Sequence, residues 1–221
     1  MSSVKIDSIT KSGGRGVSSL YYILRLSDGT SLKLSSEIIS QESIHIGQIL
    51  NETERNKILY LQTVWTVREK ALQLLSRRAH SRGEIENKLK LRGFPREIIL
   101  SVIDNLEVEG YLNDNEFALL FVRSRLLLKP SGRRLMAYEL SKRKVAPRII
   151  QEVLDKVYYN LDESQLAYQL LKKRAETYTR FGGKELKDKV FRYLKSRGFN
   201  YEHIKEALKM YCAEFPCDNI E

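Results

Sequence analysis

An internal repeat constrains the fold of this chain more than any other feature. One segment, in which an alanine precedes apolar residues and then basic ones, occurs as Ala71–Arg78, Ala118–Arg125 and Ala167–Arg174. Shifts of 47 and 49 residues relate the three copies, and the residues after each copy recur as well. A period of about 50 residues matches one unit of three helices with its loops. We therefore expect three tandem three-helix repeats.

Local motifs predict the helix boundaries of these repeats. Ser81–Glu84 has the pattern of a capping box, so the second helix of the first repeat should begin there. Gly93 and Gly198 each follow such a helix, and glycine accepts the left-handed backbone of a C-terminal cap without a Cβ penalty. The middle repeat has Lys144 in the place of the glycine. We expect that helix to end by another route, with Pro147 blocking its continuation.

The first 50 residues show the alternation of apolar and polar side chains that is typical of strands, over Val4–Ile9, Leu20–Leu26 and Ser31–Leu34. Asp28-Gly29 predicts a type I′ hairpin turn, in which both central residues have positive φ. The glycines of Gly13–Gly16 do not predict a phosphate-binding loop, because a strand and not a helix follows them. A small antiparallel sheet is the expected result.

The predicted fold class is mainly α, with three tandem three-helix repeats in an elongated array after a small antiparallel β region. Stacking is expected because the short second helix of a repeat offers few apolar residues and cannot bury enough surface alone. The expected divisions are residues 1–50 for the β region, 51–112 for a connecting helix and the first repeat, 113–160 for the second repeat and 161–221 for the third.

Nothing in the sequence assembles an active site. His45, His80 and His203 lack metal-ligand spacing, and we interpret each as a surface or capping residue. Cys212 and Cys217 are expected to be two reduced thiols. We predict no enzyme, no catalytic residue, no cofactor and no metal. The chain also shows no apolar run long enough to span a bilayer and no secretory signal, so we expect a cytoplasmic monomer without membrane contact.

Positive charge is concentrated after residue 60. The chain has 38 Lys and Arg against 28 Asp and Glu, a net charge of +10, of which residues 61–221 carry +9. Such an excess favours a polyanionic partner or a protein with an acidic face, although it also serves solubility alone. The densest stretch is 123–144, where Glu139 is the one acidic residue. The candidate partner-binding residues are Arg77, Arg78, Arg82, Lys88, Arg92, Arg123, Arg125, Lys129, Arg133, Arg134, Lys142, Arg143 and Lys144.

A longer pattern runs from the first repeat into the second and carries a family resemblance. Its residues are Ala71, Leu72, Leu75–Arg82, Glu84, Lys88, Leu89, Arg92–Phe94, Gly110–Asp114, Phe117, Ala118 and Phe121–Arg125. The pattern resembles the RecX family of bacterial regulatory proteins, and the resemblance covers about residues 67–208. Arg143-Lys144-Val145 departs from it where a glycine is usual, and the first 50 residues lie outside the family core.

The resemblance implies a stack of three-helix modules without catalytic activity of its own. It further implies a regulator in DNA repair and the SOS response, whose partner is the filament that RecA recombinase forms on single-stranded DNA. Proteins of this family lodge in the filament groove and damp strand exchange, ATP turnover and co-protease activity. The basic residues above are then the candidate contacts, and the first 50 residues are expected to cap the open end of the array.

A different class of function remains open, in which the chain binds single-stranded DNA or another nucleic acid directly. The net charge of +9 after residue 60 supports it, as do the interleaved aromatic residues Tyr138, Tyr178, Phe181 and Tyr193, which could stack on bases. Core packing is the alternative role for these rings. Binding to bare DNA and to RecA filaments over a salt series distinguishes the two functions.

Overall fold

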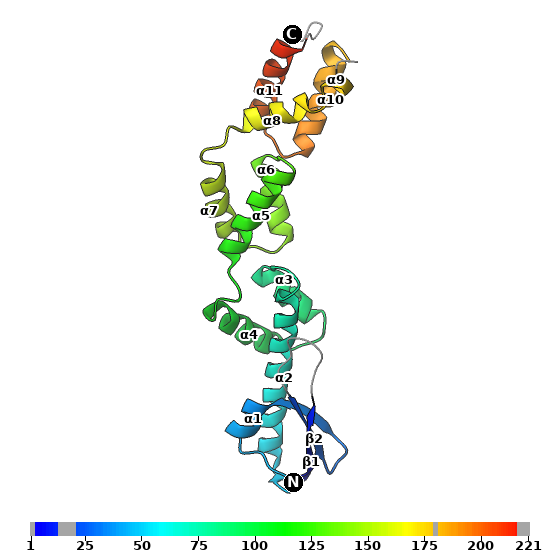
Figure 1. Cartoon of the computed structure of the whole chain (residues 1–221), viewed down its shortest axis with the longest axis vertical. Coiled ribbons are helices and arrows are strands. Elements are labelled where there is room, and N and C mark those ends of the chain that lie inside the picture. Colours follow the sequence, from blue (N-terminus) through cyan, green and yellow to red (C-terminus); the bar gives the residue numbers. More distant parts are fainter. Residues whose placement is uncertain (1–2, 13–20, 179–180, 216–221) are drawn as a thin grey trace. The chain divides into compact units, whose positions relative to one another are not determined.

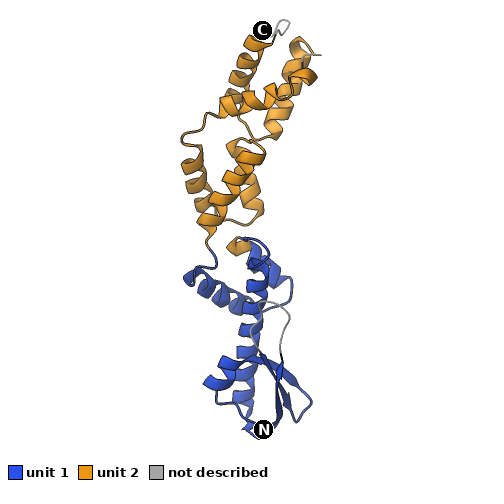
Figure 2. Ribbon diagram, in the orientation of Figure 1, with its two compact units in different colours: residues 1–80, 84–112 blue, residues 81–83, 113–221 orange. Residues whose placement is uncertain are grey.

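The computed structural model describes residues 3–12, 21–178 and 181–215 and divides into two compact units, drawn in different colours in Figure 2. Unit 1 comprises Met1–His80 and Glu84–Leu112, and unit 2 comprises Ser81–Gly83 and Asn113–Glu221. The chain is mostly helical with a small N-terminal sheet, which confirms the predicted class. The loop Gly13–Gly16 and Cys217 lie outside the described residues.

The N-terminal sheet of unit 1 is antiparallel, with strand order β3-β2-β1-β4 (Figure 1). Its strands are β1 (Val4–Ser12), β2 (Tyr21–Leu26), β3 (Ser31–Ser35) and β4 (Ile49–Leu50), and α1 (Ser36–Gln41) follows β3. Alternation buries Ile6, Leu24 and Leu34 on one face, as expected for a half-exposed sheet. These residues pack in one cluster with Ile58 of the long helix that follows.

The chain forms the predicted hairpin between β2 and β3, but its turn is not of type I′, so the predicted turn type is wrong. Gly29 has φ +80°, whereas Asp28 is not among the described residues with positive φ. The Gly29 N–H donates to the Leu26 carbonyl (2.9 Å), and the Asp28 carboxylate accepts from the Thr30 N–H (2.9 Å). One glycine therefore supplies the left-handed step, and the aspartate avoids the steric cost that positive φ would impose on it.

The long helix of the first module contributes residues to two buried clusters, that of the sheet and that of the module. The helices of this module are α2 (Glu52–Leu75), α3 (Arg82–Lys90) and α4 (Arg96–Val108). The N-terminal half of α2 contributes Ile58 to the sheet, and its C-terminal half contributes Val67, Ala71 and Leu74 to the module. The last three lie at spacings of four and three residues, so they share one helix face. Asn51 begins α2 with a capping box to Glu54.

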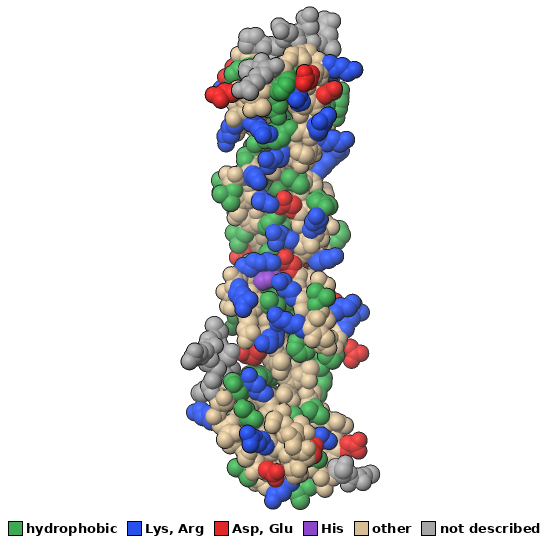
Figure 3. Space-filling model, turned by 90° about the vertical axis from the view of Figure 1, so that its right-hand side faces the viewer, with side chains coloured by type: hydrophobic (Ala, Val, Ile, Leu, Met, Phe, Trp, Pro, Cys, Tyr) green, Lys and Arg blue, Asp and Glu red, His purple; other side chains and the backbone are tan. Residues whose placement is uncertain are grey.

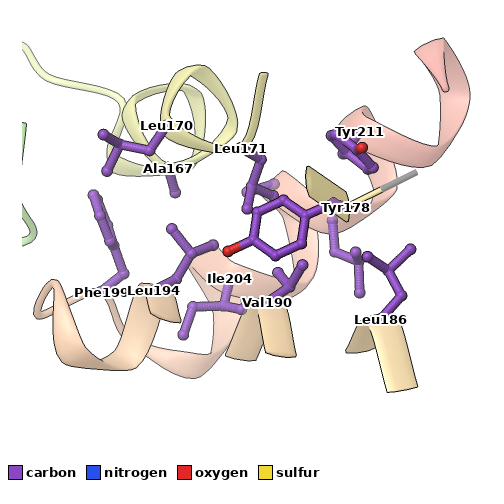
Figure 4. Close-up of a cluster of buried hydrophobic side chains, with 12 residues drawn as sticks. Ala167, Leu170, Leu171, Tyr178, Leu186, Val190, Leu194, Phe199, Ile204 and Tyr211 are labelled. Atoms are coloured by element: carbon purple, nitrogen blue, oxygen red, sulfur yellow. The ribbon is translucent and has the colours of Figure 1, made fainter. Parts of the chain in front are cut away.

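The second and third modules form unit 2. The second comprises α5 (Asp114–Leu128), α6 (Arg133–Lys142) and α7 (Pro147–Tyr158), and the third comprises α8 (Glu163–Lys172), α9 (Ala175–Tyr178), α10 (Gly183–Ser196) and α11 (Tyr201–Glu214). Each has its own buried cluster. The short α9 was not expected from the repeat, and it brings the buried Tyr178 ring in between Leu171 and Val190 (Figure 4).

In every module, the helix before the last one (α3, α6 or α10) is followed by a residue with positive φ. Gly93 (+82°) and Gly198 (+85°) confirm the predicted caps. Lys144 has φ +61°, so the expectation that α6 ends by another route is wrong. The Val145 N–H donates to the Leu140 carbonyl (3.2 Å), as Phe199 does to Leu194 (3.2 Å). The left-handed lysine costs about 1–2 kcal/mol, and burial of Val145 in the core offsets that cost.

His80 corrects a further expectation, because it is neither a surface nor a capping residue. Its side chain is 5% exposed, and Nδ1 lies 2.9 Å from the Arg78 carbonyl oxygen. Burial lowers the pKa of this imidazole, because the charged form would lose its hydration. His45 is exposed and His203 is half-buried.

Candidate partner-binding surface

Two helix starts in unit 2 make the same contact with an acidic side chain. The backbone N–H of Arg82, the first residue of α3, donates to the Asp114 carboxylate (2.7 Å). The backbone N–H of Arg133, the first residue of α6, donates to the Glu163 carboxylate (2.9 Å). The first turn of a helix has backbone N–H groups without partners inside the helix, and a carboxylate satisfies one of them with favourable charge. These contacts hold α6 in place.

A second contact recurs one residue earlier at both starts. The Ser81 hydroxyl donates to the Arg143 carbonyl, and the backbone N–H of Gly132 donates to the Arg197 carbonyl (2.9 Å). Both acceptors lie at the C-terminal ends of helices, where carbonyl groups lack partners inside the helix. The basic segment around Arg133 is therefore anchored through its backbone.

Several of the predicted cations belong to unit 1. Arg77 and Arg92 are exposed and Lys88 is half-buried. Arg78 donates to both carboxylate oxygens of Glu84 (2.9 and 3.1 Å), and this hydrogen bonding raises the pKa of its guanidinium. Within unit 1, Arg78 is thus engaged in a local ion pair, whereas Arg77 and Arg92 present their charge to solvent.

Ion pairs inside the second module engage two of the predicted cations. Arg125 of α5 donates to both carboxylate oxygens of Glu139 on α6 (3.0 and 3.1 Å). The Arg133 guanidinium pairs with Asp155 on α7. These two arginines link the helices of the module. Their charge is therefore less available to a partner than the sequence suggested.

Two other cations lie over aromatic rings. The Lys142 Nζ atom is 4.6 Å from the ring centre of Tyr138, and the Arg143 guanidinium is 4.5 Å from that of Phe121. Lys142 is exposed and Arg143 is half-buried. Cation–π contacts at exposed sites are worth about 0.5–1 kcal/mol, which is enough to orient a side chain such as Lys142. Arg82 lies at the start of α3 and is half-buried.

The remaining cations of the second module face solvent. Arg123, Lys129, Arg134 and Lys144 are exposed, and none of them forms an ion pair with another residue that the structure describes. Figure 3 shows one face of the molecule, where Lys and Arg side chains lie among apolar ones and acidic side chains are fewer. The predicted cations of this module that form no ion pair therefore lie on α5, on α6 and just after each of these two helices.

Large apolar side chains accompany these cations. On α5 we define the α5 row as Leu120, Arg123 and Leu127, with spacings of three and four residues that place them on one face. On α6 the α6 row is Arg134, Tyr138 and Lys142, each four residues apart. Leu127 is 86% exposed, its neighbour Leu128 is 83% exposed, and Leu120 and Tyr138 are more than half exposed.

The sequence analysis did not predict that these leucines are exposed, although the sequence contains a pattern that indicates it. Leu126-Leu127-Leu128 is an apolar run that no single helix face can bury, because successive residues are about 100° apart. At least one of the three had to face outward. Exposed apolar groups of this size mark surfaces that bind other molecules when they occur together.

Metal ligation has no structural basis among the described residues, because they hold no group of three His, Cys, Asp or Glu side chains that could bind a metal ion. Among the described residues, no helix has both the length and the apolar character needed to cross a bilayer.

Comparison with known proteins places these modules among described domains. Residues 68–106, 113–154 and 162–208 match the first, second and third three-helix domains of RecX. A regulatory protein RecX from Pelodictyon phaeoclathratiforme is 36% identical over 140 residues, which cover 63% of this chain and 85% of that protein. One from Streptococcus sanguinis is 28% identical over 186 residues, which cover 84% of this chain and 71% of the relative.

Solved structures share the fold. A crystal structure of regulatory protein RecX superimposes with a TM-score of 0.73 at 19% identity, covering 93% of this chain and 99% of the other. RecX from Lactobacillus salivarius gives a TM-score of 0.62 at 22% identity, covering 68% and 97%. These similarities support the module architecture, and the surface of α5 and α6 is the part of it that we consider for function.

Proposed function

This chain belongs to the RecX family of regulatory proteins, and from that premise we propose that it acts by binding the filament that RecA recombinase forms on single-stranded DNA. In this proposal the α5 row and the α6 row contact the filament and thereby inhibit strand exchange, ATP turnover and co-protease activity in DNA repair and the SOS response. The protein supplies binding and no catalytic group.

The combination of exposed cations and exposed leucines is the observation that carries this proposal. Arg123 and Arg134 offer charge to an acidic surface, and Leu120 and Leu127 offer apolar area to the same partner. Burial of apolar surface yields about 25 cal/mol per Å², and complementary charge raises the rate of association. A protein surface with acidic and apolar patches provides both kinds of contact.

A bare polynucleotide accounts for only part of this surface. Phosphates would engage the cations, yet they offer little to leucines that are 86% and 83% exposed. The filament fits better, because it presents protein surface along a nucleic acid. Arg77, Arg92 and Lys129 are further candidate contacts, since each is exposed.

Repeated contacts along a polymer explain how binding alone inhibits. Once one contact has formed, each later contact on the same filament is intramolecular, so contacts that are weak singly hold the protein in place together. A regulator held in this way opposes the conformational changes on which ATP turnover and strand exchange depend. Inhibition therefore requires no chemistry from the regulator.

The test replaces one exposed cation in each row. In the double variant Arg123→Glu with Arg134→Glu, we expect inhibition of RecA ATP turnover on single-stranded DNA to weaken at least tenfold. Arg133 is left unchanged, because its pairing with Asp155 links α6 to α7 and its reversal would perturb the module. The matched control is Lys156→Glu with Arg192→Glu, which makes the same charge change on exposed residues of α7 and α10 that form no ion pair within the described ranges. Circular dichroism checks that both variants keep their helicity.

Leu127→Ala separates the two kinds of partner. We expect it to weaken co-sedimentation with RecA filaments and to leave binding to bare single-stranded DNA unchanged. Equal inhibition by the α5–α6 variant and the wild type would remove these rows from the site. Tight binding to bare DNA with a steep salt dependence and no preference for filaments would favour direct nucleic-acid binding as the function.

A further inference from the structure

A pocket of about 280 Å³ lies between α10 and α11 of the third module, away from the rows on α5 and α6. Its lining includes Lys187 and Phe191 from α10 and Tyr201, Lys205, Leu208 and Lys209 from α11. None of these residues belongs to the candidate basic surface. Leu208 is buried and forms an apolar wall, while the lysines bring positive charge to the pocket.

Two aromatic rings lie side by side in this pocket. The ring centres of Phe191 and Tyr201 are 5.2 Å apart, and their planes are inclined by 47°. Tyr201 is 59% exposed, so its ring is not used to fill the core of the module. The exposed Tyr201 ring provides a flat apolar surface on which another planar ring can stack, and the inclined, half-buried Phe191 ring can contact the edge of that ring.

The charge around the rings is positive and partly uncompensated. Lys209 pairs with Glu206 (3.1 Å), whereas Lys187 and Lys205 form no ion pair with any residue of the described ranges. An anionic group bound here would gain two ammonium partners without first breaking an ion pair. Ammonium groups bind phosphate as flexible point charges, without a fixed bidentate geometry.

We propose that this pocket binds a nucleotide of a single-stranded nucleic acid, with the base stacked on the exposed Tyr201 ring, its edge against Phe191, and the flanking phosphates at Lys187 and Lys205. Stacking on aromatic side chains together with lysine contacts to the backbone is the usual chemistry of single-strand binding. An acidic peptide would satisfy the lysines and leave the exposed Tyr201 ring without a planar partner. The proposal does not rest on the proposed function, because it needs no RecA.

The experiment measures binding of fluorescein-labelled hexathymidylate to the full chain by anisotropy, without RecA. Tyr201→Ala is expected to weaken binding about tenfold, which is within the range of one lost base stack. Tyr201→Phe keeps the ring and should bind like the wild type. Tyr159→Ala is the matched control, because Tyr159 is 85% exposed at the end of α7 and does not line the pocket.

The lysines are tested through the salt dependence of the same binding. Lys205→Ala should reduce the slope of log K against log salt by about 0.7, the value for one phosphate contact on a single strand. Lys195→Ala, an exposed position of α10 outside the pocket lining, should leave the slope unchanged. The proposal is overturned if hexathymidylate does not bind, if Tyr201→Ala binds like the wild type, or if hexaglutamate displaces the probe as well as unlabelled hexathymidylate does.

Discussion

The starts of α3 and α6 make equivalent contacts with neighbouring residues, but different side chains form them. Both give the first backbone N–H of the helix to a carboxylate, that of Asp114 in one case and of Glu163 in the other. One residue earlier, the first start uses the Ser81 side chain and the second uses the Gly132 backbone. The contact is thus a property of the repeat, and the side chains that make it are interchangeable.

Each of these helix starts packs against the C-terminal end of another helix, α6 for the start of α3 and α10 for the start of α6. Both contacts are too close for a Cβ atom at one position of the helix start. A Cβ on Gly83 would come within 2.7 Å of the Lys144 carbonyl oxygen, and one on Gly132 would come within 2.6 Å of the Phe199 backbone nitrogen. Each start therefore needs a glycine, but at a different position. The left-handed residue is a lysine beside the first start and Gly198 beside the second. Relative to the first residue of the helix, the glycine lies one position after it in α3 (Gly83) and one position before it in α6 (Gly132). Both positions allow the same close approach of the neighbouring helix end.

Gly198→Ala should have the largest effect, because it breaks the second contact in two ways. The new Cβ would meet the backbone of Leu135, with its Cα at 2.9 Å, at a residue with φ +85°. Steric overlap and left-handed strain together should lower the free energy of unfolding by about 2–5 kcal/mol. Gly93→Ala is the matched control, since Gly93 has φ +82° with nothing within 4 Å of its added Cβ.

Gly93→Ala should lower the free energy of unfolding only through left-handed strain, by about 1–2 kcal/mol. Urea unfolding monitored by circular dichroism measures both variants, and hydrogen exchange in α6 and α10 localises the change. Equal losses at the two glycines would show that close packing at the second start contributes nothing.

Glu163→Ala and Asp114→Ala test whether the two carboxylates are equivalent. Removing the acceptor of a helix-start N–H should cost about 1–2 kcal/mol at each site. Glu163→Gln and Asp114→Asn keep an acceptor oxygen and should recover part of that loss. Glu116→Ala, an exposed acidic residue in the first turn of α5, is the control and should change unfolding by less than about 0.5 kcal/mol. A large loss at only one of the two sites would refute the equivalence.

Lys144→Gly should stabilise the protein and make the two helix ends more alike. Glycine removes the left-handed penalty of about 1–2 kcal/mol but adds chain entropy worth about 0.5–1 kcal/mol to the unfolded state, so a net gain of about 0.5–1 kcal/mol is expected. The melting temperature should rise by a few degrees. A fall would mean that the Lys144 side chain contributes more through contacts than its backbone loses through strain.

The smallest expected effect is a pH dependence of the free energy of unfolding, and it should arise at the start of α3 and not at the start of α6. His80 and Ser131 occupy equivalent buried positions just before the two starts, and only the histidine titrates. Burial lowers its pKa below the usual 6.5, so the unfolded chain binds the proton more tightly. Stability from this group is fully present above about pH 6.5 and falls as the pH drops through that value towards the folded pKa. His80→Asn should flatten the unfolding free energy between pH 7.5 and 5.5, whereas Ser131→Ala should keep its slope.

The class of fold and the repeated modules could be predicted from the sequence because they depend on local patterns. The triple repeat, the glycines at Gly93 and Gly198 and the alternation in the first strands each involve residues close together in the chain. Hydrophobic periodicity and capping act over one or two turns, so their physics is present in a short window. The turn at Gly29 shows the limit, since the dipeptide indicated a hairpin but not the conformation of Asp28.

The candidate surface could be predicted only as a set of cations. Arg125 and Arg133 have the same sequence signal as Arg123 and Arg134, yet the first two meet carboxylates 14 and 22 residues away. Such pairings depend on how helices cross and not on the residues beside each arginine. The same holds for the leucines of α5, whose exposure depends on which neighbours cover the helix.

By itself, the sequence determined that this chain forms three helical modules after a small sheet, because apolar spacing and cap residues act within each helix. Tertiary structure alone decided which charges remain available, that Lys144 takes a left-handed backbone, and that Asp114 and Glu163 each serve the start of another helix. These outcomes depend on contacts between residues about 14 to 62 positions apart, and such contacts form only when the helices pack.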